Sequence, residues 1–277
     1  MSLTRLFSTR VGSQQLNARH AIALAVKRGL DWLLHIDADE LFDPGPAGDA
    51  PAHFRELSRA GAATFCYLNV EAVPEAHGIV DPFREVTLFK RSLELVDPTP
   101  DAKEAVAFWQ ARQEGSFFYY YDNGKAAVRV HANARPLSVH EWLPGTTEGM
   151  KNWFSNMRAP WPGRGQLGDI VQYRHSDARI LHYPCYSCDA LWTRWLRGND
   201  NYRLRGQEEP PPLHARVCAA AQAAAAHGGI EAARSTVRRY FEEKVLLLDR
   251  AEAEFQQRSG VCERLRGPSR RLAAGRS

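Results

Sequence analysis

Three acidic side chains follow directly after a short apolar run near the start of the chain. Residues 30–36 read LDWLLHI, and Asp37, Asp39 and Glu40 come at once after Ile36. A run of this length predicts a buried strand, and an α/β sheet binds its ligands beyond the carboxyl ends of its strands. Alternation along an extended chain would put Asp37 and Asp39 on one face. There, one carboxylate could contact a ribose or a bound water, and the other could ligate Mg²⁺ or Mn²⁺.

The chemistry of such a turn has two interpretations. A divalent ion held by the carboxylates would stabilise the negative charge that develops on a leaving nucleoside diphosphate. The structural alternative is that Asp37, Asp39 and Glu40 cap a helix start and solvate a loop, as Asp-rich turns usually do. These three residues alone leave both interpretations open.

The elements around the turn indicate an α/β fold. Residues 14–29 have apolar side chains at helical spacing and end at a glycine, which predicts a helix leading into the strand. Residues 53–59 predict a second helix, and residues 62–73 a second strand rich in β-branched and aromatic side chains. Residues 83–90 are a third strand candidate, so helices and strands alternate.

The middle of the chain carries turn signals. Residues 117–130 contain Asn123 and Gly124 between two apolar runs, which predicts a β-hairpin with its turn at that pair. Residues 96–113 mix proline-rich turn signals with a short amphipathic piece. Residues 142–169 carry Pro and Gly at short intervals, and we interpret them as a long loop or lid.

The last third of the chain is predicted to be helical after one short strand. The strand covers residues 179–183 and the first helix covers residues 188–196. A break at residues 208–212 then precedes two further helices, at residues 215–227 and 231–258.

Composition excludes several classes of protein. The formal net charge of +4 is concentrated in an Arg-rich C-terminal tail, which argues against a nucleic-acid-binding protein. No apolar run approaches the roughly 18 to 20 residues of a membrane span, so we expect a soluble chain, either cytoplasmic or, if an anchor precedes it, in the Golgi lumen. Five cysteines without repeated spacing argue against a disulfide scaffold, and the single Cys185–Cys188 pair lacks a second pair for structural zinc.

The segment LDWLLHIDADELF resembles the DxD signature of GT-A glycosyltransferases, in particular family 2 and family 92-like enzymes with an "iDaDEf" form. The resemblance covers about residues 14–200. Further matching segments follow in the order of the family: Phe89-Lys90-Arg91, Tyr121 to Lys125 with Arg129, Val139-His140, and Leu181-His182-Tyr183.

The resemblance implies a GT-A-like mixed sheet flanked by helices over residues 1–205, with a helical C-terminal extension and basic tail over residues 206–277. It implies a metal-dependent, inverting transfer of a sugar from a nucleotide-sugar donor, a UDP-sugar first of all, to a glycan or another hydroxyl acceptor. Asp37 and Asp39 would bind Mn²⁺ or Mg²⁺ and the nucleotide diphosphate, and His182 would be a further metal ligand. The alternative for His182 is a satisfied histidine at a strand end.

The other candidate site residues lie beside these motifs. Lys125 and Arg129 could contact a phosphate or an acceptor anion, or be solvated strand residues. The candidates for substrate contact are Glu40, His140 and Trp142, although core packing competes with sugar stacking for each tryptophan. The candidates for the base that deprotonates the acceptor are Glu141, Asp122 and Asp189, and linear order cannot choose among them.

The resemblance also sets the competing hypotheses. In most family members, strand–helix elements that bind the nucleoside precede the segment that corresponds to the start of this sequence. No segment of this sequence resembles those elements. A non-catalytic carbohydrate- or protein-binding relative is therefore the alternative. A phosphohydrolase with Asp37 as nucleophile is disfavoured, because no phosphate-binding Lys and Ser/Thr arrangement accompanies it.

Overall fold

The computed structural model describes residues 10–45, 49–138, 140–145, 152–156, 171–173, 176–196 and 213–266. The chain divides into two compact units, and each is assembled from two separate stretches. Unit 1 takes residues 1–69 and 123–180, and unit 2 takes residues 70–122 and 181–277. The predicted boundary between residues 205 and 206 falls outside the described residues.

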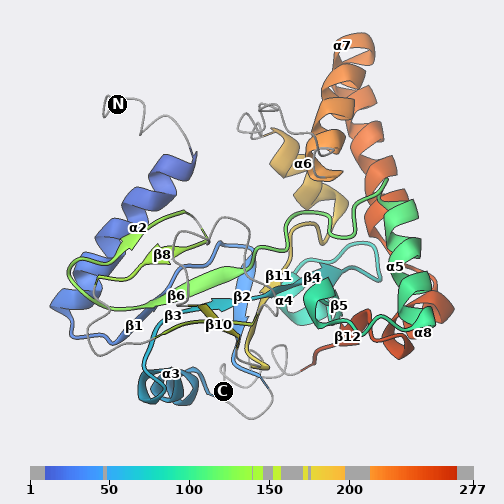
Figure 1. Cartoon of the computed structure of the whole chain (residues 1–277). Coiled ribbons are helices and arrows are strands. Elements are labelled where there is room, and N and C mark those ends of the chain that lie inside the picture. The colour runs from blue at the N-terminus through green and yellow to red at the C-terminus, as the bar shows by residue number, and fades with distance from the viewer. Residues whose placement is uncertain are drawn as a thin grey trace, which may run out of the picture. The chain divides into compact units, whose positions relative to one another are not determined.

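Unit 1 is built on a mixed sheet with the strand order β1-β6-β3-β9-β10. Strand β6 is antiparallel to both β1 and β3, whereas β9 is parallel to both β3 and β10. The elements of unit 1 are α2 (Arg10–Lys27), β1 (Trp32–Leu34), β2 (Glu40–Asp43), α3 (Ala50–Arg59), β3 (Ala62–Tyr67), β6 (Lys125–Arg129), β7 (Arg135–Pro136), β8 (Trp142–Leu143), β9 (Asn152–Ser155) and β10 (Val171–Tyr173) (Figure 1).

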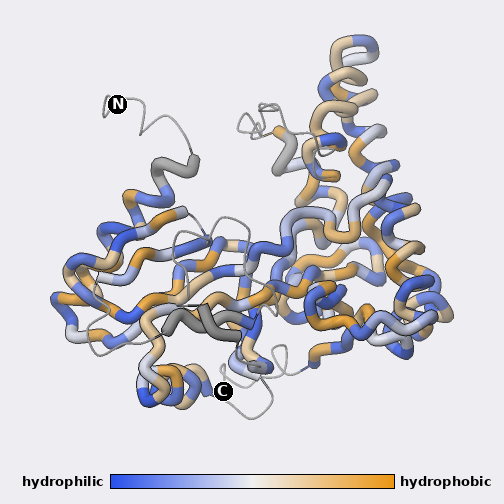
Figure 2. Tube along the Cα trace, in the orientation of Figure 1, coloured by the Kyte–Doolittle hydropathy of each residue, from blue (hydrophilic) through white to orange (hydrophobic). Residues whose placement is uncertain are grey.

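Helices α2 and α3 cover opposite faces of this sheet (Figure 1). Successive residues of a strand point to opposite faces, and the two apolar clusters of unit 1 follow that alternation. One cluster joins Leu57 of α3 to Phe65 and Ala127, and the other joins Ile22 of α2 to Cys66. Figure 2 shows hydrophilic and hydrophobic residues mixed along α3, as expected for a helix that buries one face.

Unit 2 holds the β12-β5-β4-β11 part of a second sheet. Strand β5 is antiparallel to both β12 and β4. Strands β4 (Asn69–Val73) and β11 (Arg179–His182) begin in unit 1 and continue into unit 2. The other elements of unit 2 are α4 (Pro82–Glu85), β5 (Leu88–Lys90), the 3₁₀ turn η1 (Leu93–Leu95), α5 (Pro100–Arg112), α6 (Cys188–Leu196), α7 (Leu213–Tyr240), the π-helical turn η4 (Phe241–Val245), α8 (Arg250–Arg258) and β12 (Cys262–Arg264).

Two apolar clusters hold unit 2 together. The first packs Trp109 of α5 against Leu88 of β5 and Val261 beside β12. The second packs Leu213 and Val217 of α7 against Phe241 of η4, with further members from α6. Each cluster therefore contains residues from both stretches of the chain that form the unit.

The predicted α/β class is confirmed, and most helices and strands occur where the sequence predicts them. The strand at residues 30–36 is shorter than predicted, and its side chains are half-buried because β1 is an edge strand of the sheet. The strand predicted at residues 62–73 is interrupted at Leu68 and forms β3 and β4. The strand predicted at residues 83–90 begins only at Leu88, because Pro82 starts the short helix α4.

The predicted hairpin at residues 117–130 is wrong. Only its second arm is a strand, β6, and β6 pairs with β1 and β3. The first arm is irregular, because the backbone N–H groups of Tyr119 and Tyr120 donate to the buried carboxylate of Glu71 at 2.7 and 2.9 Å. A side chain thus takes the hydrogen bonds that a partner strand would have supplied.

Two other segments differ from the prediction in extent. Residues 96–113 contain a full helix, α5, whose N-cap Thr99 accepts a hydrogen bond from the backbone N–H of Ala102 at 3.1 Å. The predicted lid at residues 142–169 contains the strands β8 and β9, and most of the remainder lies outside the described residues. The break predicted at residues 208–212 also lies outside them.

Candidate functional site

The acidic turn closes on itself between β1 and β2. The backbone N–H of Glu40 donates to the Asp37 carbonyl at 3.1 Å, and the backbone N–H of Asp37 donates to Glu40 Oε2 at 2.7 Å. Glu40 is 7% exposed. Its carboxylate therefore points back into the turn and fixes the turn's shape. The predicted contact of Glu40 with substrate stays a prediction.

Asp37 is held by residues from two other elements of unit 1. Lys125 Nζ, at the start of β6, lies 2.6 Å from Asp37 Oδ2 and 3.6 Å from Glu40 Oε2. Gln14 of α2 donates from Nε2 to the other carboxylate oxygen of Asp37 at 2.8 Å. Both oxygens of Asp37 thus have a donor from the chain itself.

The charges of this cluster shift its pKa values in different directions. Burial works to raise the pKa of Asp37, but the Lys125 ammonium offsets it, and the pKa is lowered. Burial raises the pKa of Glu40 to about 7, against the opposing effect of Lys125. The pKa of His35 is lowered by burial and then by Lys125. At neutral pH the firm ion pair is therefore Asp37 with Lys125, and Glu40 is near its midpoint.

The position of Lys125 is set by the glycine before it. Gly124 has φ 65°, and a Cβ at this position would lie 1.8 Å from the Tyr67 carbonyl oxygen. The Gly124 N–H donates to Asn69 Oδ1 at 3.0 Å. The Asn-Gly pair is thus needed for a close approach to β3, not for a hairpin turn, and it brings Lys125 into the sheet with a side chain that is 1% exposed. A side chain buried in this way is not accessible to a phosphate that approaches from the solvent.

His140 faces the same segment of backbone. Its Nδ1 lies 2.9 Å from the Gly124 carbonyl oxygen, and its backbone N–H donates to Ser138 Oγ at 3.0 Å. A carbonyl oxygen only accepts, so Nδ1 carries the proton in this contact. His140 is half-buried and contributes to the lowered pKa of Asp37.

The remaining candidates of unit 1 have less distinctive surroundings. Trp142 is 2% exposed and packs in the cluster that includes Ile22 and Cys66. A ring buried in this way offers no face for a sugar, so the structure favours core packing over sugar stacking for this residue. Glu141 and Arg129 are half-buried, and Arg129 pairs with Trp32 across β6 and β1.

Three predicted site residues belong to unit 2. Asp122 is exposed, and Asp189 is exposed in the first turn of α6. His182 ends β11, is 9% exposed and lies edge-on to the ring of Tyr120 with centroids 5.7 Å apart. The roles predicted for these three residues stay predictions.

The residues of the acidic turn do not fit a divalent ion at Asp37. The Lys125 ammonium already lies against the carboxylates of Asp37 and Glu40. Among the residues that the structure describes, no group of three or more His, Cys, Asp and Glu side chains is arranged to hold a metal ion. The binding of Mn²⁺ or Mg²⁺ stays a prediction.

Sequence reasoning missed two residues of this cluster. Gln14 lies 23 residues before its partner Asp37, within a helix whose pattern signals only burial of one face. His35 lies in the apolar run and was read as part of the strand. Its place two residues before Asp37 was the only signal available.

Two curated Arabidopsis thaliana proteins are similar to this chain. They are glycosyltransferase-like At2g41451 and glycosyltransferase-like At3g57200, and each is 34% identical over 135 residues, or 47% of this chain. The chain spans only 28% and 25% of the length of these two relatives. No family model and no solved structure matches. The similarity supports a glycosyltransferase-like family.

No helix among the described residues is long and apolar enough to cross a membrane.

Proposed function

We propose that this chain carries the donor side of a GT-A-like glycosyltransferase, which moves a sugar from a nucleotide-sugar, a UDP-sugar first of all, to a hydroxyl of a glycan or another acceptor. The observation that carries the proposal is the acidic turn at residues 37–40, which Lys125, Gln14 and its own hydrogen bonds hold in one shape. The glycosyltransferase-like relatives support the same class of reaction.

A rigid turn of this kind suits recognition of a donor. A carboxylate fixed before the ligand arrives needs no further ordering when it accepts hydrogen bonds from hydroxyl groups of a ribose or a sugar. Asp37 has its carboxylate fixed by two donors, and Asp39 lies two residues further on in the same turn. We therefore assign donor contact to these two aspartates.

The proposed transfer is a single displacement with inversion. The acceptor oxygen forms a bond to the anomeric carbon as the bond from that carbon to the diphosphate oxygen breaks, and the nucleoside diphosphate leaves. A base takes the proton of the acceptor hydroxyl, and Glu141, Asp122 and Asp189 remain the candidates. Positive charge or hydrogen-bond donors near the diphosphate would stabilise the leaving group.

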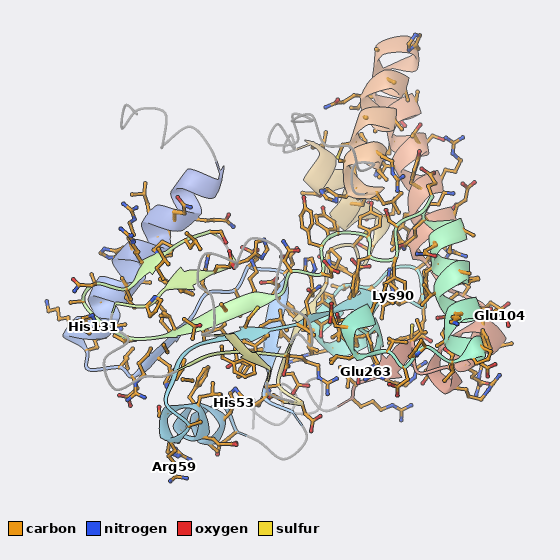
Figure 3. All side chains as sticks on the ribbon, viewed as in Figure 1. His53, Arg59, Lys90, Glu104, His131 and Glu263 are labelled. Carbon is orange, nitrogen blue, oxygen red and sulfur yellow. The ribbon has the colours of Figure 1, made fainter. Side chains whose placement is uncertain are left out.

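The test is donor binding to an Asp39→Asn variant. Calorimetric titration of UDP and UDP-glucose into the millimolar range should show binding to the wild type and roughly tenfold or greater weakening in Asp39→Asn, which corresponds to about 1.4 kcal/mol. The matched control is Glu104→Gln, which removes an exposed acid on α5 (Figure 3) and should bind as the wild type does.

Two results would count against the proposal. Equal affinity of wild type and Asp39→Asn would mean that the turn does not contact the donor. Binding of a glycan without binding of either nucleotide would favour the non-catalytic, carbohydrate-binding alternative.

A further inference from the structure

The counter-charge of the acidic turn comes from a residue far away in the sequence. Lys125 is separated from Asp37 by 88 positions, yet its Nζ lies 2.6 Å from Asp37 Oδ2 and 3.6 Å from Glu40 Oε2. The lysine side chain is 1% exposed and that of Glu40 is 6% exposed. A buried ammonium is thus in contact with one carboxylate and close to a second. It lies where a cation bound by both carboxylates would lie.

The backbone keeps this ammonium in place. Lys125 begins β6, which is hydrogen-bonded to a strand on each side, and it is paired with Tyr67 of β3. Gly124 packs against the Tyr67 carbonyl and is tied to Asn69, so the start of β6 has no room to move toward β3. Lys125 is therefore a built-in part of the turn and not a surface side chain that happens to reach it.

The charge of the cluster argues against a divalent ion beside this lysine. The Lys125 ammonium, on a side chain that is 1% exposed, lies 2.6 Å from Asp37 Oδ2 and so already supplies a positive charge at this carboxylate. A divalent ion bound to the same carboxylates would place its charge next to a buried ammonium, and two cations in a medium of low effective dielectric repel strongly. Gln14 also donates to the second oxygen of Asp37.

We infer that Lys125 occupies the place of a divalent ion between Asp37 and Glu40, so that this half of the acidic turn is neutralised by the chain itself and binds no metal. The inference rests on the proposed function only for its consequence, which is that Asp37 contacts the donor as a hydrogen-bond acceptor. The geometry of the cluster carries the rest.

The direct test removes the ammonium and asks whether a metal takes its place. Lys125→Met keeps an unbranched side chain that is one atom shorter, and it leaves the half-buried carboxylate of Asp37 and the buried carboxyl group of Glu40 without a cation. Its thermal unfolding midpoint should be lower than that of the wild type. MnCl₂ at millimolar concentration should raise that midpoint by more than it raises the midpoint of the wild type or of the control Lys103→Met, which alters an exposed lysine on α5. The added response should disappear in the double variant Lys125→Met/Asp37→Asn.

A second variant keeps the inference testable if Lys125→Met does not fold. Calorimetry with MnCl₂ on wild type and Asp37→Asn, without nucleotide, should give the same result for both proteins. Metal affinity that is present in the wild type and lost in Asp37→Asn would overturn the inference, and so would a folded Lys125→Met that gains no response to Mn²⁺. Absence of UDP binding to the wild type would instead count against the proposed function, and it would leave these metal measurements unaffected because they contain no nucleotide.

Discussion

Glu40 combines a structural task with an unusual charge state. Its carboxylate accepts the hydrogen bond that closes the turn, and its side chain is almost fully buried. Burial raises the pKa of Glu40 to about 7, although Lys125 works in the opposite direction. A carboxyl group that is half protonated at neutral pH links the stability of the turn to pH, because the unfolded chain releases the same proton near pH 4.5.

The Glu40→Gln variant should therefore change how stability depends on pH. The folded wild type keeps a proton that the unfolded chain has lost between pH 4.5 and about 7, so its free energy of unfolding falls as pH rises through this window. The fall is at most about 3 kcal/mol, from 1.36 kcal/mol per pKa unit. Glu40→Gln cannot ionise and should lack it.

Urea unfolding at a series of pH values measures the difference between the two proteins. The other groups close to Glu40 are Lys125, Asp37 and Asp39, and they are present in both proteins. Their contributions cancel to a first approximation in the difference. The exposed substitution Glu104→Gln serves as the control, and stability curves of wild type and Glu40→Gln that run parallel across the window would contradict the prediction.

At the residue scale, the sequence could predict where the acids lie but not what neutralises them. Asp37, Asp39 and Glu40 form a local pattern next to an apolar run, so their place at the end of β1 was accessible. The partners of Asp37 lie 88 and 23 positions away, and no local pattern encodes such pairs. Lys125 was accordingly expected either to contact a phosphate or an acceptor anion or to be a solvated strand residue, and the structure buries it beside the carboxyl groups of Asp37 and Glu40.

Strands β4 and β5 are joined by a buried ion pair that also organises the segment after α5. Lys90 Nζ lies 2.6 Å from Glu71 Oε1, and the two residues are directly opposite each other across the strands. Lys90 also donates to the Phe117 carbonyl at 2.6 Å and lies over the ring of Trp109. Burial lowers the pKa of Lys90, whereas the nearby Glu71 carboxylate opposes this effect. Figure 3 labels Lys90 in unit 2.

Removing both partners of this pair should cost less free energy of unfolding than the sum of the costs of removing each one alone. Glu71→Gln leaves the ammonium buried without its carboxylate, and we expect a loss of about 3 to 5 kcal/mol in the free energy of unfolding. The double variant Glu71→Gln/Lys90→Met leaves no unpaired charge and should be closer to the wild type than the sum of the two single variants. Chemical denaturation of all four proteins measures this coupling, and additive losses would show that the two side chains do not depend on each other.

At the element scale, local patterns predicted helices better than pairing. The helix at residues 188–196 was predicted with the bounds of α6, and a helix–strand order was predicted for α2 and β1. The hairpin failed because Asn123 and Gly124 also suit a close approach between backbones, and because Glu71 supplies the acceptors for the first arm. Both causes depend on residues outside the segment, namely the carbonyl of Tyr67 and the carboxylate of Glu71.

Each of the two compact units of the molecule is held together by contacts between stretches that are distant in the sequence. Unit 2 joins residues 70–122 to the C-terminal helices, and its clusters place Trp109 of α5 beside residues of β12 and α8. Trp109 Nε1 also donates to Gln256 Oε1 at 2.9 Å across this core. Such contacts between distant segments are invisible to local patterns. The helical C-terminal extension beginning at residue 206, which the family resemblance implied, stays a prediction.

A fragment ending at residue 205 should therefore lose structure well before its own end. It lacks α7, η4, α8 and β12, so β5 loses a neighbouring strand and Trp109 loses the partners of its buried face. Hydrogen exchange should show amides of residues 70–122 losing protection in the fragment relative to the full chain, because their apolar cluster is exposed to water. Residues 10–34 and 123–138, whose strands belong to sheets that contain none of the deleted elements, should keep their protection and serve as the internal control. If residues 70–122 stay protected in the fragment, the C-terminal helices form a separate domain, and the boundary predicted from the sequence is the better description of this chain.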